Sequence, residues 1–363
     1  MRPFAQELVE QVIDCSADSN AMKAWGLVCK TWLPRTRYHL FSKVSLSHDN
    51  LSSFVDLVEA SPLPLLSCIH DLTLCYNGAP PDTELLGRIH SCPNLRSISI
   101  QIRGSFEENQ DAPDWLDSEE SFLVHIRAWG TISSSISTLN LEVQGIDDIP
   151  LQTIVDIIAC VPTITRLSMH GDDETWEFIN ADGGIPPSFP LALKELDLTG
   201  NGTDSLFEWL LTLPIIPCLK HLNLHGSLGD VSRVIGYIQQ AGHELEDFRV
   251  HLPIPETDTL PFLEQVLPYT PKLKTISFDC WEPSTALAIL RLLPSSGLHF
   301  IKFSFLPDST EGVPWAEFDL TLAVPRFSAL RGVSVYSYEE RHSLITTEIK
   351  LLMPLASARG ILE

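Results

Sequence analysis

The feature that most constrains the fold is a short apolar phrase that recurs along most of the chain. In each copy, one apolar residue is followed three positions later by a second and two positions after that by a third. Ten copies begin 25 to 32 residues apart, with one wider spacing of 41. Alternating apolar residues indicate a strand with one buried face, so the phrase predicts a strand in every copy. The copies are Ile69-Leu72-Leu74, Leu95-Ile98-Ile100, Ile136-Leu139-Leu141, Ile164-Leu167-Met169, Leu193-Leu196-Leu198, Leu219-Leu222-Leu224, Leu245-Phe248-Val250, Leu273-Ile276-Phe278, Leu298-Ile301-Phe303 and Leu330-Val333-Val335.

Segments with helical spacing of apolar residues lie between the copies, and prolines often follow them. Proline cannot continue a helix, so these prolines mark where the helices end. The repeating unit is therefore strand, turn, helix, turn. The helical segments include 51–60, 83–90, 151–160, 205–213, 231–240 and 285–293.

A strand followed by a helix, at a period of about 27 residues and with this apolar phrase, resembles the leucine-rich repeat. The resemblance implies an α/β fold in which about ten strand-helix units stack into a solenoid with a parallel, curved sheet. A doubly wound α/β domain also alternates strands and helices. The copies of similar length, and the lack of a glycine-rich phosphate loop after any strand, favour the solenoid.

The first 46 residues have a different pattern, which predicts three short helices. Apolar residues around Leu8 and Ile13 and around Leu27 recur at helical spacing, and Pro34 suits the first turn of a third helix. Three helices of this size bury little surface alone, so one face must meet a partner. Phe41-Val44-Leu46 fits the apolar phrase, which indicates that the helices run into the repeats without a flexible linker.

The stretch from Leu27 to Phe41, LVCKTWLPRTRYHLF, together with Glu7-Leu8-Val9 and Val12-Ile13-Asp14, resembles the F-box of fungal F-box proteins. The resemblance covers residues 2 to about 46. It implies docking on a Skp1-type adaptor, which bridges to a cullin-RING ubiquitin ligase. The alternative is a helical cap over the end of the repeats. The adaptor-binding residues that the resemblance implies are Pro3, Leu8, Ile13, Leu27, Val28, Trp32 and Leu33.

We therefore predict an F-box-like domain at 1–46 and a leucine-rich-repeat-like solenoid at 47–363, with an acidic insertion near 104–120. The insertion contributes acids without a base, which is typical of a solvated loop and also suits capture of a basic segment. With 24 Lys and Arg against 47 Asp and Glu, the net charge is −23. So acidic a surface repels nucleic acids and anionic membranes. With no charged leader or apolar span, the chain is expected to be cytoplasmic, nuclear or both.

The strand positions that do not face the core predict a polar recognition surface. In each copy, the residue directly after the last apolar position points away from the core. In three successive copies these residues are His225, His251 and Asp279, which we expect to lie side by side because adjacent strands are about 4.8 Å apart. A metal site of two histidines and a carboxylate is an alternative there, but recognition is favoured, so no metal or cofactor is predicted. The expected substrate-binding residues are His170, His221, His225, Arg249, His251 and Asp279.

No catalytic motif is found: the chain lacks a Gly-x-Ser-x-Gly elbow, a Walker loop, His-Glu-x-x-His and an EF-hand loop. The eight cysteines are scattered without a Cys-x-x-Cys pair, which argues against a zinc module. We do not expect an enzyme. The function predicted is substrate recognition for a Skp1-cullin-F-box ubiquitin ligase, and the alternative is a repeat scaffold without a ligase role.

Overall fold

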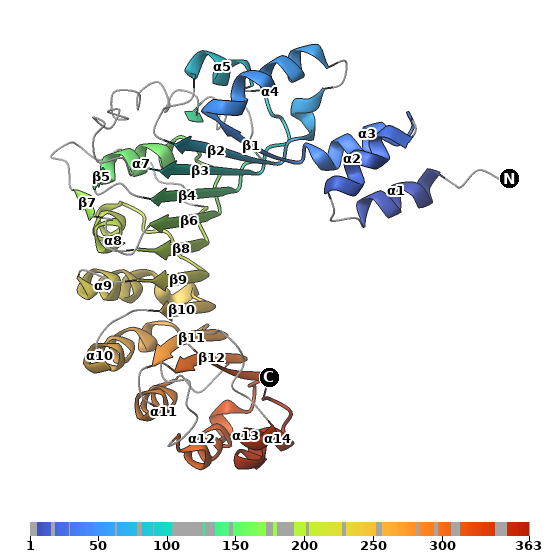
Figure 1. Ribbon diagram of the computed structural model, residues 1–363. Coiled ribbons are helices and arrows are strands. Elements are labelled where there is room, and N and C mark those ends of the chain that lie inside the picture. Colours follow the sequence, from blue (N-terminus) through green and yellow to red (C-terminus); the bar gives the residue numbers. More distant parts are fainter. Residues whose placement is uncertain are drawn as a thin grey trace, which may run out of the picture. The chain divides into compact units, whose positions relative to one another are not determined.

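The chain folds into strand-helix repeats, seen in the computed structural model in Figure 1. Pro3, Cys29 and the predicted acidic insertion near 104–120 lie outside the described residues. The structure describes residues 6–15, 19–28, 30–61, 64–77, 82–89, 91–103, 126–127, 135–144, 148–171, 177–179, 192–200, 203–226, 230–251, 256–280, 283–293, 297–305, 313–337 and 347–362.

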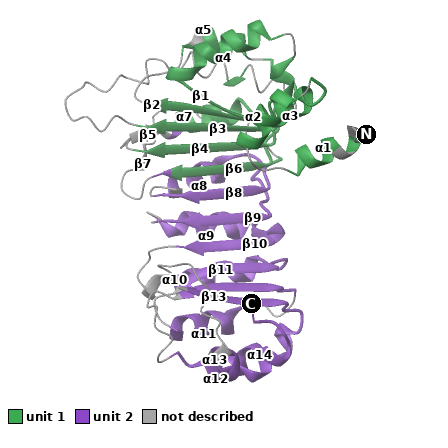
Figure 2. Ribbon diagram, turned by 45° about the vertical axis from the view of Figure 1, so that its right-hand side comes forward, with its two compact units in different colours: residues 1–146, 152–170, 183–192 green, residues 147–151, 171–182, 193–363 purple. Residues whose placement is uncertain are grey.

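The residues form two compact units, coloured separately in Figure 2. Unit 1 comprises residues 1–146, 152–170 and 183–192, and unit 2 comprises 147–151, 171–182 and 193–363. The three N-terminal helices therefore belong to the same unit as the first strands. A domain boundary at residue 46 stays a prediction.

Unit 1 begins with helices and continues with strands that alternate with helices. Its elements are α1 (Gln6–Asp14), α2 (Ser19–Val28), α3 (Leu33–Leu40), β1 (Lys43–Ser47), α4 (His48–Ala60), the 3-10 helix η1 (Leu65–Cys68), β2 (Asp71–Asn77), α5 (Thr83–Arg88), β3 (Ser97–Arg103), β4 (Thr138–Gln144), α7 (Leu151–Ala159) and most of β6 (Arg166–Gly171).

Unit 2 repeats the alternation and ends in a cluster of helices. Its elements are β5 (Asp148–Pro150), β7 (Glu177–Ile179), β8 (Glu195–Thr199), α8 (Thr203–Thr212), β9 (His221–His225), α9 (Val231–Ala241), η2 (Gly242–Glu244), β10 (Asp247–His251), α10 (Glu256–Val266), η3 (Leu267–Tyr269), β11 (Thr275–Cys280), α11 (Pro283–Leu292), β12 (Phe300–Phe305), α12 (Trp315–Leu322), η4 (Pro325–Phe327), β13 (Gly332–Ser337), α13 (Thr347–Leu352) and α14 (Pro354–Ala358).

The larger sheet holds eleven strands in sequence order, β1-β2-β3-β4-β6-β8-β9-β10-β11-β12-β13. Each pairing whose register is described in this sheet is parallel. Every copy of the apolar phrase contributes its last two residues to one of these strands, and Val44 and Leu46 do the same in β1. The chain thus has the predicted α/β leucine-rich-repeat fold. A separate pair of three-residue strands, β5 and β7, was not predicted.

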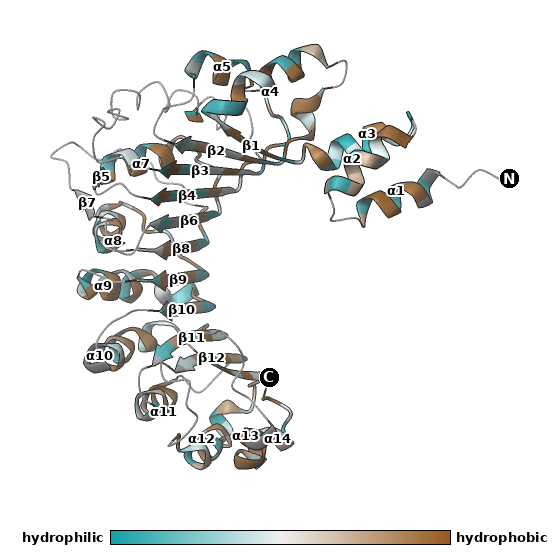
Figure 3. Cartoon of the chain, viewed as in Figure 1, coloured by the Kyte–Doolittle hydropathy of each residue, from teal (hydrophilic) through white to brown (hydrophobic). Residues whose placement is uncertain are grey.

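The core of unit 2 lies between its strands and the helices that follow them (Figure 3). The last two phrase residues of β8 to β13 are buried. Phe278 and Phe303 stack with ring centroids 5.9 Å apart, and Phe303 stacks on Phe318 of α12 at 5.6 Å. Burying each such side chain contributes roughly 1.5–3 kcal/mol, so successive repeats stabilise one another across a continuous apolar layer.

The C-terminal helices close the last repeat. Asp319 of α12 is buried and accepts hydrogen bonds from the backbone N–H groups of Leu355 (3.0 Å) and Ala356 (2.7 Å) at the start of α14. The chain end then returns to β13, where the Val333 N–H donates to the carbonyl of Ile361 at 2.6 Å. One backbone N–H of the edge strand is thereby satisfied by the chain's own C-terminal segment. Among the described helices, none is long and apolar enough to cross a membrane.

Candidate functional site

Two surfaces carry the residues predicted for function, and the first is the helical segment α1–α3. An ion-pair cluster holds α1 against α3. Arg35 donates from Nε and Nη2 to the two carboxylate oxygens of Asp14, both at 2.6 Å, and His39 Nε2 lies 2.8 Å from Asp14 Oδ1. The Arg35 hydrogen bonds, followed by that of His39, lower the pKa of Asp14 from 3.8 to about 2.

A close approach of backbone and side chain fixes α2 against α3. A Cβ atom on Gly26 would lie 3.2 Å from the Thr36 hydroxyl oxygen. Thr36 is buried, and its hydroxyl donates to the carbonyl of Trp32 or Leu33, each 3.1 Å away. Glycine therefore lets the two helices meet more closely than a larger residue would.

Tyr38 ties α3 to the first repeat. Its hydroxyl lies 3.3 Å from His70 Nε2, while His70 Nδ1 lies 2.7 Å from the carbonyl of Cys68 in η1. The Tyr38 and His70 rings meet edge to face at 5.3 Å. The third helix is thus fixed to the repeat by both a hydrogen bond and ring packing.

Apolar side chains at the ends of α1 and α2 remain exposed. Val12 is 60% exposed, Leu27 is 89% exposed and Val28 is 61% exposed. We call these three residues the apolar helical surface. Leu27 and Val28 are adjacent at the end of α2, and an exposed pair of large apolar side chains suits contact with another protein.

Some of the residues predicted to bind an adaptor are exposed to solvent, and others are buried. Leu27 and Val28 are exposed, whereas Ile13 is 1% exposed and helps hold the helices together. Trp32 and Leu33 are partly buried. Pro3 and the side chain of Leu8 lie outside what the structure describes. Val12 was not predicted to bind, although it lies beside Ile13 in the same apolar stripe.

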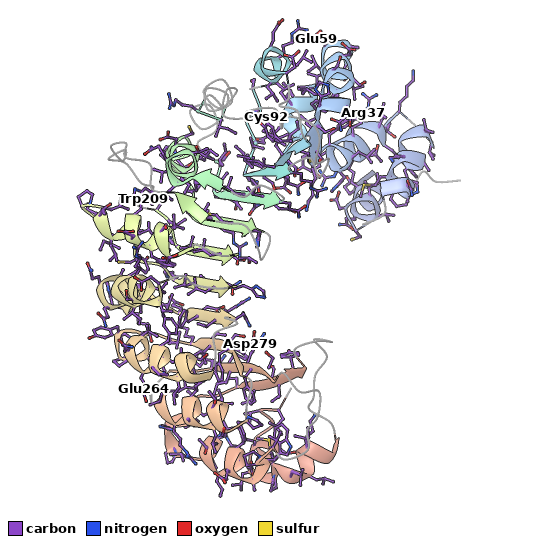
Figure 4. The ribbon with its side chains drawn as sticks, turned by 60° about the vertical axis from the view of Figure 1, so that its left-hand side comes forward. Arg37, Glu59, Cys92, Trp209, Glu264 and Asp279 are labelled. Atoms are coloured by element: carbon purple, nitrogen blue, oxygen red, sulfur yellow. The ribbon has the colours of Figure 1, made fainter. Side chains whose placement is uncertain are left out.

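The second surface is the face of the unit 2 sheet that carries the polar strand residues, which we call the open face. Its residues align in three columns across β8 to β13. The helices pack on the opposite side, as seen for Trp209 and Glu264 in Figure 4, where Asp279 lies on the strands. The columns are Glu195-His221-Asp247-Thr275-Phe300-Gly332, Asp197-Asn223-Arg249-Ser277-Lys302-Ser334 and Thr199-His225-His251-Asp279-Ser304-Tyr336.

The third column brings together the three residues predicted to stand side by side. The His225 and His251 ring centroids are 5.9 Å apart, and His251 Nδ1 lies 3.0 Å from Asp279 Oδ2. Ser304 donates to the other Asp279 oxygen. Only 9% of the Asp279 side chain is exposed. The carboxylate is therefore fixed between two strands, which orients the His251 ring.

Ser277 extends this arrangement, with its hydroxyl 3.5 Å from His251 Nε2. The order Asp279, His251, Ser277 has the connectivity of a hydrolase triad. However, Ser277 is only 7% exposed, and 3.5 Å is the outer limit of a hydrogen bond. The contacts position His251 rather than present a nucleophile. Among the described residues, no group of three or more His, Cys, Asp or Glu side chains is arranged to hold a metal ion.

The other predicted substrate-binding residues lie outside the third column. Arg249 donates to Asp247 of the same strand at 3.0 and 3.2 Å, and His221 Nδ1 lies 3.8 Å from the same carboxylate group. These side chains are accordingly engaged on the open face. His170 lies in unit 1, with Nε2 2.6 Å from the hydroxyl of Ser168.

Unit 1 carries a hydrogen-bonded row of its own on β2, β3 and β4. The Cys75 thiol lies 3.2 Å from Gln101 Oε1, and Gln101 Nε2 donates to Glu142 at 2.7 Å. These are three of the outermost strand positions in the sequence pattern, and none of them was singled out as a ligand contact. The row is internally satisfied, as is common for strand surfaces.

No protein-family model matches the chain, and no curated protein matches it in sequence. Solved structures are similar to it at low identity. The leucine-rich repeat-containing protein LegL7 from Legionella pneumophila is 14% identical over 89% of this chain and 94% of that chain, with a TM-score of 0.49. The complex of Rad7 and Elc1 in yeast gives 14% identity over 97% of this chain and 85% of that chain, with a TM-score of 0.42. The fold assignment rests on this chain's own strand order and register.

Proposed function

We propose that this protein is the substrate-recognition subunit of a Skp1-cullin-F-box ubiquitin ligase, acting in the cytoplasm, the nucleus or both. The helices α1–α3 dock a Skp1-type adaptor, and the strand surfaces bind the target protein. The chain contributes proximity and orientation, while the bond-forming chemistry takes place on other subunits.

The observation that carries this proposal is the apolar helical surface of Val12, Leu27 and Val28. Burial of each side chain in an interface is worth roughly 1.5–3 kcal/mol before the costs of association. A purely structural cap would instead enclose its apolar residues, including Trp32, which remains partly exposed. The helices are also tied to each other and to η1, so a docked adaptor would be held firmly against the repeats.

Target binding is proposed for the polar strand residues His170, His221, His225, Arg249, His251 and Asp279. Polar side chains that are already oriented by neighbours lose little freedom on binding and favour a ligand of matching geometry. The fold has no need of histidines in these positions, since packing depends on the apolar phrase on the other face of each strand.

Co-expression with a Skp1-type adaptor tests the docking proposal. The wild-type chain is expected to co-purify in a one-to-one complex, and a variant carrying Leu27→Asp and Val28→Asp is expected to lose it. Both side chains are exposed, so the variant should fold normally. Ile215→Asp provides a matched control, because Ile215 is also 61% exposed but lies after α8 in unit 2.

Retention of the adaptor by the double variant would contradict docking through this surface. A well-folded wild-type chain that ignores the adaptor would remove the ligase role altogether. The helices would then be a cap, and the protein would be an interaction scaffold.

A further inference from the structure

Lys302 occupies the middle column of the open face, on β12. Its neighbours in register are Ser277 of β11 and Ser334 of β13, both of which are buried. Lys302 itself is only partly exposed. The residues directly across from Lys302 on the two neighbouring strands thus offer hydroxyls and no negative charge.

The other charged residues of the open face are engaged. Asp197 accepts from Asn223 at 2.8 Å, Arg249 pairs with Asp247 at 3.0 Å, and Asp279 binds both His251 and Ser304. Within the part of the chain that the structure describes, Lys302 is the charged residue of this face that makes no hydrogen bond or ion pair.

Asp279 is the carboxylate closest to Lys302 in register, one strand away and displaced by two residues. A lysine can span such a diagonal. In the structure the Asp279 carboxylate contacts other partners: Oδ2 lies 3.0 Å from His251 and Oδ1 accepts from Ser304. Among the described residues, Lys302 therefore has no carboxylate partner in the structure.

Two other lysines beside this sheet, unlike Lys302, are neutralised by a glutamate. Lys220 and Lys274 share Glu246 at 3.2 and 2.5 Å at the start of β9 to β11. An ammonium group without an anion beside it gains a charge-assisted hydrogen bond when an anionic ligand binds.

We propose that Lys302 binds a carboxylate of an acidic segment of the target protein, with the hydroxyl of Tyr336 as a second donor. Tyr336 lies on β13, beside Ser304 and diagonal to Lys302. Its hydroxyl, like the Lys302 amine, makes no hydrogen bond with the described residues. Both groups donate to an oxygen anion, which matches a glutamate or aspartate side chain.

This assignment deepens the proposed function, because it uses the surface proposed to hold the target. It also sets a condition on the target. The protein carries a net charge of −23 and repels acidic chains at long range, so the segment must place its carboxylate directly at Lys302.

Titration of the full-length protein with a triglutamate peptide at near-physiological salt, followed by backbone amide NMR shifts, tests the site. Shifts are expected on β11 to β13 around Lys302, and the Lys302→Gln variant should bind about tenfold more weakly, as expected for loss of one charged hydrogen bond. Lys194→Gln is the matched control, since Lys194 is exposed, precedes β8 and removes the same charge.

An equal weakening by Lys194→Gln would show a general charge effect and overturn the proposal, as would unchanged affinity in Lys302→Gln or shifts confined to other strands. Co-purification of the Lys302→Gln variant with a Skp1-type adaptor distinguishes a failure of this proposal from a failure of the ligase role. Loss of peptide binding with the adaptor retained supports the site. If the wild type binds peptide at Lys302 but no adaptor, the site stands and the ligase role fails.

Discussion

At the scale of single residues, the turn after β9 depends on glycine. Gly226 has φ of +106°, and a Cβ atom there would lie 2.9 Å from the carbonyl oxygen of Gly200 in the preceding repeat. The Gly226 N–H donates to the carbonyl of His251 at 3.0 Å, so the turn also supports the end of β10. Neither the conformation nor the close approach is available to a residue with a side chain.

Gly226→Ala is therefore expected to lower the free energy of unfolding by about 2 kcal/mol or more, from backbone strain plus the clash. Gly297→Ala is the matched comparison, because Gly297 has φ of +95° but nothing within 4 Å of its Cβ position. Denaturant unfolding of both variants measures the difference. Equal losses would mean that the contact with Gly200 contributes nothing.

The open face shows how far single residues could be predicted. Strand alternation places His225, His251 and Asp279 in one column, and the structure has them there. The pairing of Asp279 with Ser304 could not be predicted, because alternation gives the face of a residue but not its hydrogen-bond partner. The exposure of Val12 rather than Ile13 likewise depends on how α1 packs on its neighbours.

At the scale of elements, the attachment of α1 to α3 depends on pH. Asp14 has its pKa lowered from 3.8 to about 2 by Arg35 and His39, so its contribution to stability is fully present above pH 3.8. It is lost as the pH falls through about 2, where the carboxylate is protonated in the folded state too. The stability difference between wild type and Asp14→Asn should therefore be largest near pH 6 and shrink toward pH 2.

Unfolding of both proteins by denaturant across this pH range measures that difference. Arg326→Gln serves as a control without a carboxylate, since Arg326 donates to the carbonyls of Arg291 and Leu290 in unit 2. A difference between wild type and Asp14→Asn that stays constant with pH would contradict the assigned ion pair.

The C-terminal helices offer a second test at this scale. Asp319→Ala would leave the buried N–H groups of Leu355 and Ala356 without their acceptor, at an expected cost of about 2 kcal/mol. Asp319→Asn keeps one acceptor oxygen and should cost less. Thermal unfolding ranks the two variants, and equal losses would contradict the expectation, because the oxygen that Asn retains would then contribute nothing.

The strands that contain the apolar phrase could be predicted from the sequence. The short strands β5 and β7 and the C-terminal helices α13 and α14 could not. The phrase marks each strand of the larger sheet because every one buries the same face. The pair β5 and β7, each three residues long, is too short for a period to show. Helices α13 and α14 pack through Asp319 and the return of Ile361 to β13, which are contacts distant in sequence.

At the scale of the whole molecule, we propose different partners for the two surfaces. In the proposed function, the apolar helical surface on α1 and α2 binds the adaptor, and the open face of the unit 2 sheet binds the target. Substitutions on one surface should then leave binding at the other unchanged, since they share no residue and no hydrogen bond among the described contacts. Measuring adaptor binding and peptide binding for both Val28→Asp and Lys302→Gln tests whether the two surfaces act independently.

Hydrogen exchange of the full-length chain, with and without a Skp1-type adaptor, tests the central claim most directly. Protein binding slows the exchange of amides that it covers or stabilises. We expect slower exchange in α1 and α2, around Val12, Leu27 and Val28, and unchanged exchange in β9 to β12. Unchanged exchange in α1 and α2 at saturating adaptor, or protection of the open face instead, would contradict it.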